Sequence, residues 1–534
     1  MYRDGKIYLG ISDDGNKTPV EMYLNMCNRH GLIAGASGTG KTITMKVMAE
    51  SFSDAGVPVF LCDVKGDVSG LAMPGAQSES MEKRIDKFGI RDTFSYKGYP
   101  VCFWDIYQEK GHPVRATISD MGPELLARIL DLTPAQEGVL NIVFRIADDK
   151  GLVLVDLKDL RAVLNYVSEH KSEFMLTYGS VAPQSIGGIL RALLPLESQG
   201  GDLFFGEPAL DIFDWIRTDA DGKGMVNILD SVKLVQNPSL YASFLLWMMA
   251  ELFERLPEAG DMDKPKLVFF FDEAHMLFSG APKVLVQKIE QVVKLIRSKG
   301  VGIYFVTQSP SDIPDSVLAQ LSNRVQHALR AYTPAEQKAV KVAAQSFRAN
   351  SSFKTEDVIM NLGVGHALTS FLDESGVPGI VQQTSVICPQ SLMAPVDEAL
   401  RTRLMGSDGM SRYDASVDNW SAYEELSGQA EEEQKKAELE AERAQLEKEK
   451  AAFAKQKEKE AAAAQKQKEK EEELARKKKE REEEAARRKK EKEEEEARKK
   501  KEKAAERRKA QIERTLISTG GQILKRGLLK TLFK

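Results

Sequence analysis

Short apolar runs bounded by Gly, Pro or Asp recur through the first 400 residues, with helix-like patterns between them. Runs of this kind are typical of strands buried on both faces of a parallel sheet. Four of them predict strands at residues 57–62, 224–229, 267–271 and 302–307. The pattern therefore favours an α/β fold built on a parallel sheet.

Between residues 120 and 220 the pattern changes to helical spacing, with few strand signals. Sheet-like segments return at about residue 221 and end with strand-rich stretches at 366–372 and 380–387. We interpret residues 1–119 and 221–400 as two parts of one core, interrupted by an all-helical insertion.

A polar stretch at 401–430 offers few apolar residues to bury and predicts a linker. Beyond it, residues 429–519 contain neither Gly nor Pro and are rich in Ala, Glu, Lys, Arg and Gln, which favour helix. Glu precedes a basic residue by four positions at Glu472–Arg476, Glu484–Arg488 and Glu495–Lys499. The apolar seam is thin, so residues 431–515 predict a single charged helix or a weak coiled coil, with Leu439, Leu446, Phe453 and Leu474 in heptad register.

Residues 516–534 form a basic segment in which one helical face is apolar. Ile523, Leu524, Leu528 and Leu532 share that face, while the lysines and arginines stay solvated. Three interpretations remain open: a docking peptide for a protein partner, a cap that folds back on the body, and a membrane-surface segment.

Charge is distributed unevenly along the chain. Residues 431–534 hold 34 of the 75 Lys and Arg residues and 26 of the 80 Asp and Glu residues, so residues 1–430 carry a net charge of −13. The start of the chain has no apolar signal region, and no uncharged apolar run is long enough to span a membrane. The expected location is the cytoplasm, where four separated cysteines are expected to be buried and reduced: Cys27, Cys62, Cys102 and Cys388.

Residues 35–42 match the phosphate-loop pattern G-x-x-x-x-G-K-[ST], between an apolar stretch and a helical run. Backbone N–H groups of such a loop surround phosphates, Lys41 reaches the β and γ oxygens, and the Thr42 hydroxyl ligates Mg²⁺. The expected nucleotide-binding residues are Gly35, Ala36, Ser37, Gly38, Thr39, Gly40, Lys41 and Thr42.

The apolar run at 267–271 ends in two acids, Asp272 and Glu273. Ligands bind at the carboxyl edge of parallel sheets, so Asp272 is expected to hold Mg²⁺ through water and Glu273 to orient or deprotonate the attacking water. Gln308 ends the next apolar run and is expected to contact the γ-phosphate or that water, unless it only caps its loop. His275 is interpreted as structural.

Arg324 and Arg330 flank a further apolar strand. An arginine delivered to a neighbouring subunit's γ-phosphate accelerates phosphoryl transfer, so either residue is a candidate arginine finger, and surface ion pairing is the alternative for both. Asp63 and Asp67 follow the strand at 57–62 and are candidates for water-mediated contacts at the same edge.

These motifs, with residues 294–302, 305–310 and 320–330, resemble the HerA-like branch of the HerA/FtsK P-loop ATPases, close to the YjgR-type bacterial proteins. The resemblance covers about residues 1–400 and 520–534. It implies a RecA-like core with a helical insertion, hexameric rings, Mg²⁺ and ATP as cofactors, and movement along DNA. It also implies the same roles for Lys41, Thr42, Asp272, Glu273 and Gln308, and an arginine finger at Arg324 or Arg330.

Two features depart from the family pattern. Only 34 residues precede Gly35, too few for the N-terminal β-barrel of HerA relatives. His366 stands where YjgR-type sequences usually have Glu, so no role of that Glu is transferred to it.

Two functions follow from the sequence. The first is a motor that pulls duplex DNA through a ring, for which Lys288, Lys294, Arg297 and Lys299 offer a local basic face or simply a solvated helix surface. The second is an ATP-dependent assembly or remodelling protein whose helical tail engages a protein partner. A third interpretation, a scaffold protein that does not hydrolyse ATP, does not explain the presence of Lys41 and Glu273 in their motifs.

Overall fold

The computed structural model describes residues 1–260, 262–278 and 283–513. Within them, one mixed sheet has the strand order β1-β2-β13-β12-β11-β4-β10-β9-β5-β8-β6-β7, and β3 pairs with β2. The strands are β1 (Tyr2–Arg3), β2 (Lys6–Ser12), β3 (Pro19–Tyr23), β4 (Gly31–Ala34), β5 (Val59–Asp63), β6 (Val101–Asp105), β7 (His112–Pro113), β8 (Val226–Asp230), β9 (Leu267–Phe271), β10 (Val301–Thr307), β11 (Asn323–Gln326), β12 (His366–Ser370) and β13 (Gln382–Val386).

From β11 through β4, β10, β9, β5, β8 and β6 to β7, every neighbouring pair is parallel. The four strands predicted from apolar runs are present as β5, β8, β9 and β10, with ends that differ by up to two residues. This confirms the expected α/β fold built on a parallel sheet. Because β10 lies between β4 and β9, the segments that follow these three strands open at one edge of the sheet.

The other half of the sheet is antiparallel. The chain's first residues form β1, β2 and β3, and β2 pairs with β13 through Ser12 and Thr384. The sequence did not predict these N-terminal strands, of which β2 also pairs with a strand some 370 residues further along the chain.

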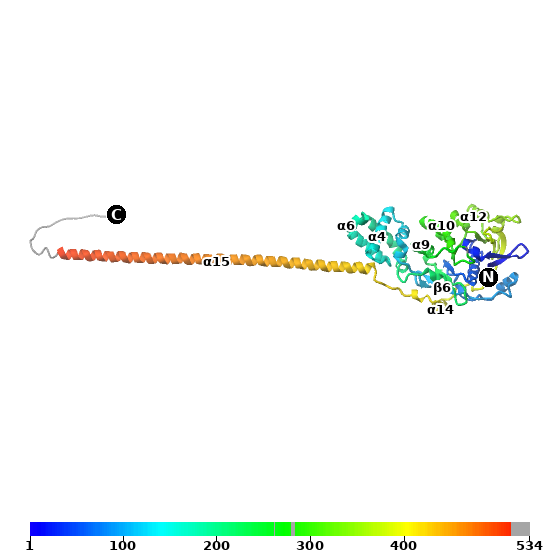
Figure 1. Cartoon of the computed structure of the whole chain (residues 1–534), viewed down its shortest axis with the longest axis horizontal. Coiled ribbons are helices and arrows are strands. Elements are labelled where there is room, and N and C mark those ends of the chain that lie inside the picture. Colours follow the sequence, from blue (N-terminus) through cyan, green and yellow to red (C-terminus); the bar gives the residue numbers. More distant parts are fainter. Residues whose placement is uncertain (261, 279–282, 514–534) are drawn as a thin grey trace, which may run out of the picture. The chain divides into compact units, whose positions relative to one another are not determined.

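The helical insertion packs on α9 (Pro238–Arg255) and shares one buried hydrophobic cluster with the sheet. Leu140, Val163 and Leu193 of the insertion share one buried cluster with Phe60 and Phe269 of the sheet. Figure 1 shows α4 and α6 of the insertion grouped together. The helices are α1 (Lys41–Asp54), α2 (Glu79–Phe88), α3 (Ile118–Ile129), α4 (Pro134–Lys150), α5 (Leu157–Glu169), α6 (Lys171–Tyr178), α7 (Pro183–Ser198), α8 (Gly201–Phe204), α9 (Pro238–Arg255), α10 (Lys283–Leu295), α11 (Asp315–Leu318), α12 (Pro334–Gln345), α13 (Thr355–Asn361), α14 (Glu398–Met405) and α15 (Ala422–Glu513).

The stretch at 401–430 differs from the expected linker. Met410 and Tyr413 are buried in the main core, and α15 already begins at Ala422. The start of this helix is fixed by Asp159 of α5, whose carboxylate accepts hydrogen bonds from Ser421 Oγ (2.6 Å) and Tyr423 N (2.9 Å). A few apolar residues and one buried acid are therefore enough to attach a segment whose average composition is polar.

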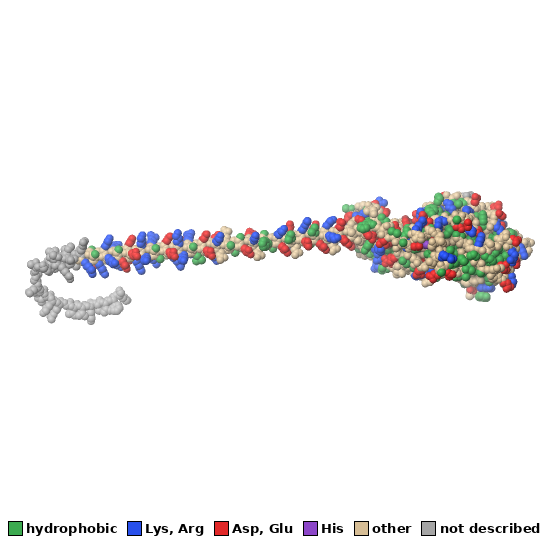
Figure 2. Space-filling model, turned by 90° about the horizontal axis from the view of Figure 1, so that it is seen from below, with side chains coloured by type: hydrophobic (Ala, Val, Ile, Leu, Met, Phe, Trp, Pro, Cys, Tyr) green, Lys and Arg blue, Asp and Glu red, His purple; other side chains and the backbone are tan. Residues whose placement is uncertain are grey.

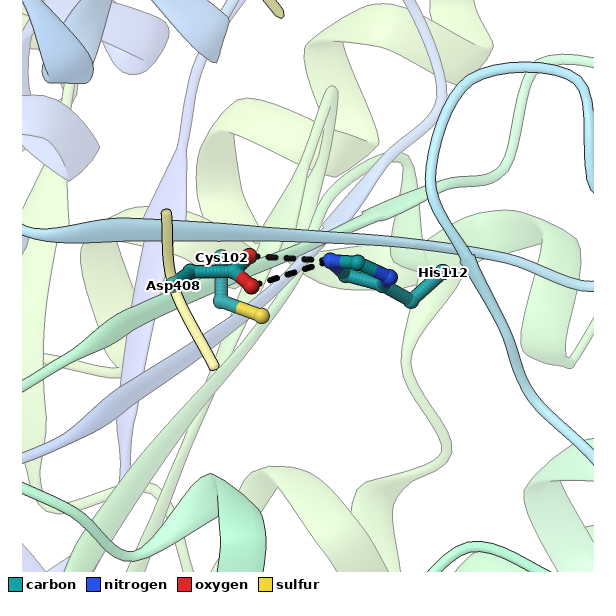
Figure 3. A group of neighbouring side chains, drawn as sticks. All are labelled: Cys102, His112 and Asp408. Atoms are coloured by element: carbon teal, nitrogen blue, oxygen red, sulfur yellow. Dashed lines mark hydrogen bonds and ion pairs between the residues drawn. The ribbon is translucent and has the colours of Figure 1, made fainter. Parts of the chain in front are cut away.

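His112 of β7 also anchors this stretch (Figure 3). Its Nε2 lies 3.0 Å from both carboxylate oxygens of Asp408, and its Nδ1 lies 2.6 Å from Asp414 Oδ1. Burial opposes protonation, but the hydrogen bonds that the protonated ring donates to the two aspartates outweigh it and raise the pKa of His112. Cys102 lies beside this group, and all four cysteines are buried and free.

Residues 431–534 form a separate unit, described as helix up to Glu513. Figure 2 shows basic and acidic side chains interspersed along α15. The expected pairs Glu484–Arg488 and Glu495–Lys499 are present, whereas Arg476 pairs with Glu480 instead of Glu472. The heptad residues are at least half exposed. Among the described residues, no helix is long and apolar enough to cross a membrane. The segment 516–534 lies outside the described residues.

Candidate nucleotide-binding site

The phosphate loop connects β4 to α1, which begins at Lys41. Its glycines are required by the backbone: Gly38 (φ 76°) and Gly40 (φ 118°) are left-handed, and a Cβ on Gly35 would come within 2.5 Å of His327 Cβ. The loop therefore has the tight, side-chain-poor path that allows backbone N–H groups to approach phosphates.

Lys41 points back into its own loop. Its Nζ donates to the carbonyl oxygens of Gly35 (2.6 Å) and Ala36 (3.2 Å), and Thr39 Oγ1 also donates to Ala36 O (2.7 Å). Burial lowers the pKa of Lys41, while the negative charge of Glu273 raises it. The phosphate loop and the acid at the end of β9 are thus close enough to act on each other electrostatically.

His327 contacts α1, the helix that follows the phosphate loop. The sequence did not predict this contact. The Nε2 of His327 lies 2.9 Å from Thr44 Oγ1 of α1, and its Nδ1 lies 3.0 Å from His366 O. Burial lowers the pKa of His327 to about 4, so the ring is neutral at neutral pH. A neutral ring here fixes α1 without adding charge beside the phosphates.

Asp272 and Glu273 follow β9 directly and are both buried. Glu273 has a left-handed backbone (φ 48°), and its N–H donates to Asp272 Oδ1 (2.9 Å). Such a conformation costs about 1–3 kcal/mol for a residue other than glycine and is concentrated at functional sites. Among the described residues, Asp272 Oδ2 has no hydrogen-bond partner. Burial raises the pKa of Asp272, and Lys65 opposes the rise.

Gln308 and His275 flank the carboxylate of Glu273. Gln308 Nε2 donates to Glu273 Oε2 (3.3 Å), and His275 Nδ1 lies 3.2 Å from the same oxygen without hydrogen-bond geometry. Both side chains line an open pocket of about 660 Å³ next to the acids. His275, for which the sequence indicated only a structural role, is a direct neighbour of Glu273.

Lys65 is the residue of this site that the sequence analysis missed. It lies in the loop after β5, with Nζ 2.7 Å from Glu273 Oε1 and 3.6 Å from Asp272 Oδ2. Burial alone would raise the pKa of Glu273, but Lys65 lowers it below its usual value. The signal was present: a basic residue two positions after Asp63, at the carboxyl end of a parallel strand.

Asp63 has a different role from the one expected. Its Oδ1 and Oδ2 accept hydrogen bonds from the backbone N–H groups of Lys65, Gly66, Asp67 and Val68 at 2.7–3.3 Å. Burial raises its pKa to about 6. The carboxylate thus shapes the loop that carries Lys65. Asp67 Oδ1 is buried without a hydrogen-bond partner among the described residues.

The two candidate arginine fingers differ in their surroundings. The guanidinium group of Arg324 donates to the carbonyl oxygens of Leu321 (2.9 Å), Ser346 (2.7 Å) and Leu318 (3.0 Å). Arg330 is exposed, two residues beyond Ala328, whose carbonyl oxygen accepts from Ala36 N of the phosphate loop. The Arg324 side chain is therefore hydrogen-bonded within its own chain, whereas the Arg330 side chain is exposed.

The basic face suggested after β9 is smaller than expected. Lys299 is buried, where it donates to Leu256 O (2.8 Å) and pairs with Glu258. Lys294 and Arg297 are exposed, and Lys288 is half-buried. Lys299 therefore belongs to the packing of the core and not to a surface that meets a polymer.

The donor set fits a magnesium ion. Hydroxyl and carboxylate oxygens are the ligands that Mg²⁺ prefers, and it is usually held by one or two carboxylates together with substrate phosphates. Thr42 supplies a hydroxyl at the start of α1, and Asp272 supplies a buried carboxylate oxygen without a hydrogen-bond partner among the described residues. These two side chains are the ones that would hold the ion.

The chain is similar to a known protein family and to a curated protein. The family model described as "Helicase HerA-like C-terminal" matches residues 9–476. A curated relative, the DNA double-strand break repair helicase HerA of Sulfolobus acidocaldarius, is 20% identical over 375 residues, covering 66% of this chain and 64% of the relative. The chain thus spans less than two thirds of that relative's length.

Solved structures that are similar include an unbound form of the bacterial conjugative coupling protein TrwBdeltaN70. It is 14% identical, with a TM-score of 0.47 and coverage of 74% of this chain and 92% of that one. VirB4 of Thermoanaerobacter pseudethanolicus is 16% identical, with a TM-score of 0.44 and coverage of 72% and 97%.

Proposed function

Because the chain belongs to the Helicase HerA-like C-terminal family, we propose that it is a Mg²⁺-dependent ATP hydrolase that forms rings and moves along DNA. The observation that supports hydrolysis is the meeting of three strand ends at one edge. The phosphate loop after β4, the acids after β9 and Gln308 after β10 converge there. The curated relative, a DNA repair helicase, supports DNA as the polymer.

Hydrolysis uses the chain's own groups as follows. Lys41 exchanges its two loop carbonyls for the β and γ oxygens of ATP, and the loop N–H groups surround the phosphates. Glu273 accepts a proton from the attacking water, which bonds to the γ-phosphorus while the bond to ADP breaks. Gln308 orients the Glu273 carboxylate through its amide. When bound, Mg²⁺ neutralises charge that develops on the phosphate oxygens.

In a ring, Arg330 of one subunit completes the site of the next. It is the exposed member of the candidate pair, and the carbonyl groups that hold Arg324 keep that side chain inside its own subunit. The ring proposal itself comes from the family. Its direct check is the mass of the protein in solution with and without ATP.

The DNA proposal is tested by adding duplex DNA to the ATPase assay at rising salt. We expect stimulation at low salt that falls steeply with ionic strength, because contacts to phosphates release bound counter-ions. The Glu273→Gln variant is the control for contaminating ATPases. Unchanged hydrolysis in the presence of DNA at low salt would contradict the motor.

One observation favours a second function, an ATP-dependent assembly or remodelling protein. Helix α15 presents mixed charge and half-exposed apolar residues along its described length, which resembles a spacer more than a DNA-binding stripe. Residues 1–430, which we call the body, carry a net charge of −13 and therefore have no overall electrostatic attraction for DNA.

Deletion of residues 431–534 separates the two functions. A motor that resides in the body keeps both hydrolysis and DNA stimulation after the deletion. An assembly protein keeps hydrolysis but no longer recovers its partner in a pull-down. Loss of DNA stimulation on deletion would contradict the first view, and unchanged recovery of the partner would contradict the second.

A further inference from the structure

The ammonium group of Lys65 lies between the two acids that follow β9. Its Nζ is 2.7 Å from Glu273 Oε1 and 3.6 Å from Asp272 Oδ2. Asp272 Oδ2 has no hydrogen-bond partner in the part of the chain that the structure describes. The ammonium group of Lys65 therefore lies next to the Asp272 oxygen that is expected to bind Mg²⁺. The inference drawn from this contact rests on the proposed function.

The backbone of the loop around Lys65 is held by hydrogen bonds, but the Lys65 side chain is partly exposed. Asp63 fixes the backbone from Lys65 to Val68 through four hydrogen bonds, and Gly66 takes the left-handed conformation that closes the turn. By contrast, the Lys65 side chain is 40% exposed, whereas those of Asp272 and Glu273 are 2% and 7% exposed. The ammonium group can withdraw along its flexible stem while the backbone keeps its path.

An ammonium group and a divalent ion at the same carboxylate repel each other strongly in a partly dry site. Without Lys65, two buried and adjacent carboxylates would be left facing each other, which is also unfavourable. Lys65 thus stabilises the pair before the metal arrives and competes with the metal for it.

We propose that Lys65 is an internal counter-ion that holds Asp272 and Glu273 until Mg²⁺-nucleotide displaces it. While Lys65 is in place, the oxygen assigned to the metal and the carboxylate assigned to the attacking water are both engaged. Metal binding moves Lys65 away, so the same event loads the metal and frees Glu273. Lys65 acts through the two acids and is a positioning residue.

The test measures binding of Mn²⁺, as a probe for Mg²⁺, to the nucleotide-free full-length protein by electron paramagnetic resonance. We expect Lys65→Met to bind Mn²⁺ about tenfold more tightly than wild type, because a repelling charge has been removed. Lys65→Arg keeps the charge and should stay within about twofold of wild type. Lys233→Met, which removes a lysine paired with Glu109 at 2.6 Å elsewhere, is the matched control and should change nothing.

Two further binding measurements test whether the change in Mn²⁺ affinity depends on the contact between Lys65 and the acids. Adding Asp272→Asn to Lys65→Met should abolish the gain, because the Mn²⁺ then loses its carboxylate. With a non-hydrolysable ATP analogue present, Mn²⁺ still has to displace Lys65, so Lys65→Met should again bind Mn²⁺ more tightly than wild type. Equal nucleotide-free affinities of wild type and a folded Lys65→Met protein would overturn the proposal, as would an equal gain in Lys65→Arg. Neither measurement needs hydrolysis, DNA or a ring, so the failure of the proposed function would be seen separately.

Discussion

The Nζ of Lys41 lies 2.6 Å from the carbonyl oxygen of Gly35, inside its own phosphate loop. While its ammonium group donates to these loop carbonyls, Lys41 cannot donate the same hydrogens to phosphate oxygens. Nucleotide binding therefore exchanges two internal hydrogen bonds for contacts to a highly charged ligand, and Lys41 contributes to affinity only by the difference.

Lys41→Ala should weaken ATP binding by about 10- to 100-fold, which corresponds to the loss of a charged hydrogen-bond donor. Titration calorimetry with a non-hydrolysable ATP analogue measures this directly. Lys338→Ala, at an exposed position on α12, is the matched control and should bind as wild type does. An affinity of Lys41→Ala within twofold of wild type would contradict the role of the loop.

The two arginines should behave differently. Arg330→Ala should leave nucleotide affinity near that of wild type but lower turnover on the order of 1,000-fold, and mixing it with wild type should reduce activity more than in proportion. Arg324→Ala should instead lower the free energy of unfolding by about 2 kcal/mol or more, because three carbonyl groups lose their donor. Mixing experiments and chemical denaturation provide the two readouts.

A linear loss of activity on mixing Arg330→Ala with wild type would show that each site is complete within one subunit. Full stability of Arg324→Ala would show that its three hydrogen bonds contribute little to the fold.

His112 gives the attachment of residues 408–414 a dependence on pH. The pKa of His112 is raised in the folded protein, so its contribution to stability is complete below about pH 6.5, the value of a free histidine. The contribution is lost as the pH rises through the higher folded value. Its neighbours are the carboxylates of Asp408 and Asp414 and the thiol of Cys102.

The difference in unfolding free energy between wild type and His112→Gln should therefore shrink from pH 6 to pH 9. Denaturant titrations at several pH values measure it, with His170→Gln of the insertion as control. Metal analysis of the purified protein accompanies the experiment, since Cys102, His112 and Asp408 are residues of a metal-binding type. A difference that grows with pH would contradict the ion pair.

Features that depend on short sequence spacing could be predicted from the sequence. The phosphate loop, the acids after β9 and the buried strand cores each show their character within about ten residues. The Lys65–Glu273 contact and the contact of His327 with α1 were not predicted, because each joins segments more than 200 residues apart and only Lys65 has a sequence signal of its own. The strands before residue 30 were also not predicted, although β2 pairs locally with β1 and β3.

Residues 401–430 show a second limit, which is that average composition does not reveal single buried residues. Residues 401–430 have a polar average, and the average predicts a linker. The burial of Met410 and Tyr413, and the hydrogen bonds of Asp159 to Ser421 and Tyr423, depend on single residues that composition cannot weigh. A boundary inferred from composition is therefore displaced wherever a few apolar side chains reach the core.

The most direct test of the account compares ATP binding and ATP hydrolysis by wild type and Glu273→Gln, with Glu258→Gln as a control at an exposed acid. The amide keeps the size of the side chain but cannot accept the proton of the attacking water. We predict that Glu273→Gln binds ATP within about threefold of wild type yet hydrolyses it at least 100-fold more slowly. Hydrolysis at the wild-type rate would contradict the assignment of the reaction to the acids that end β9.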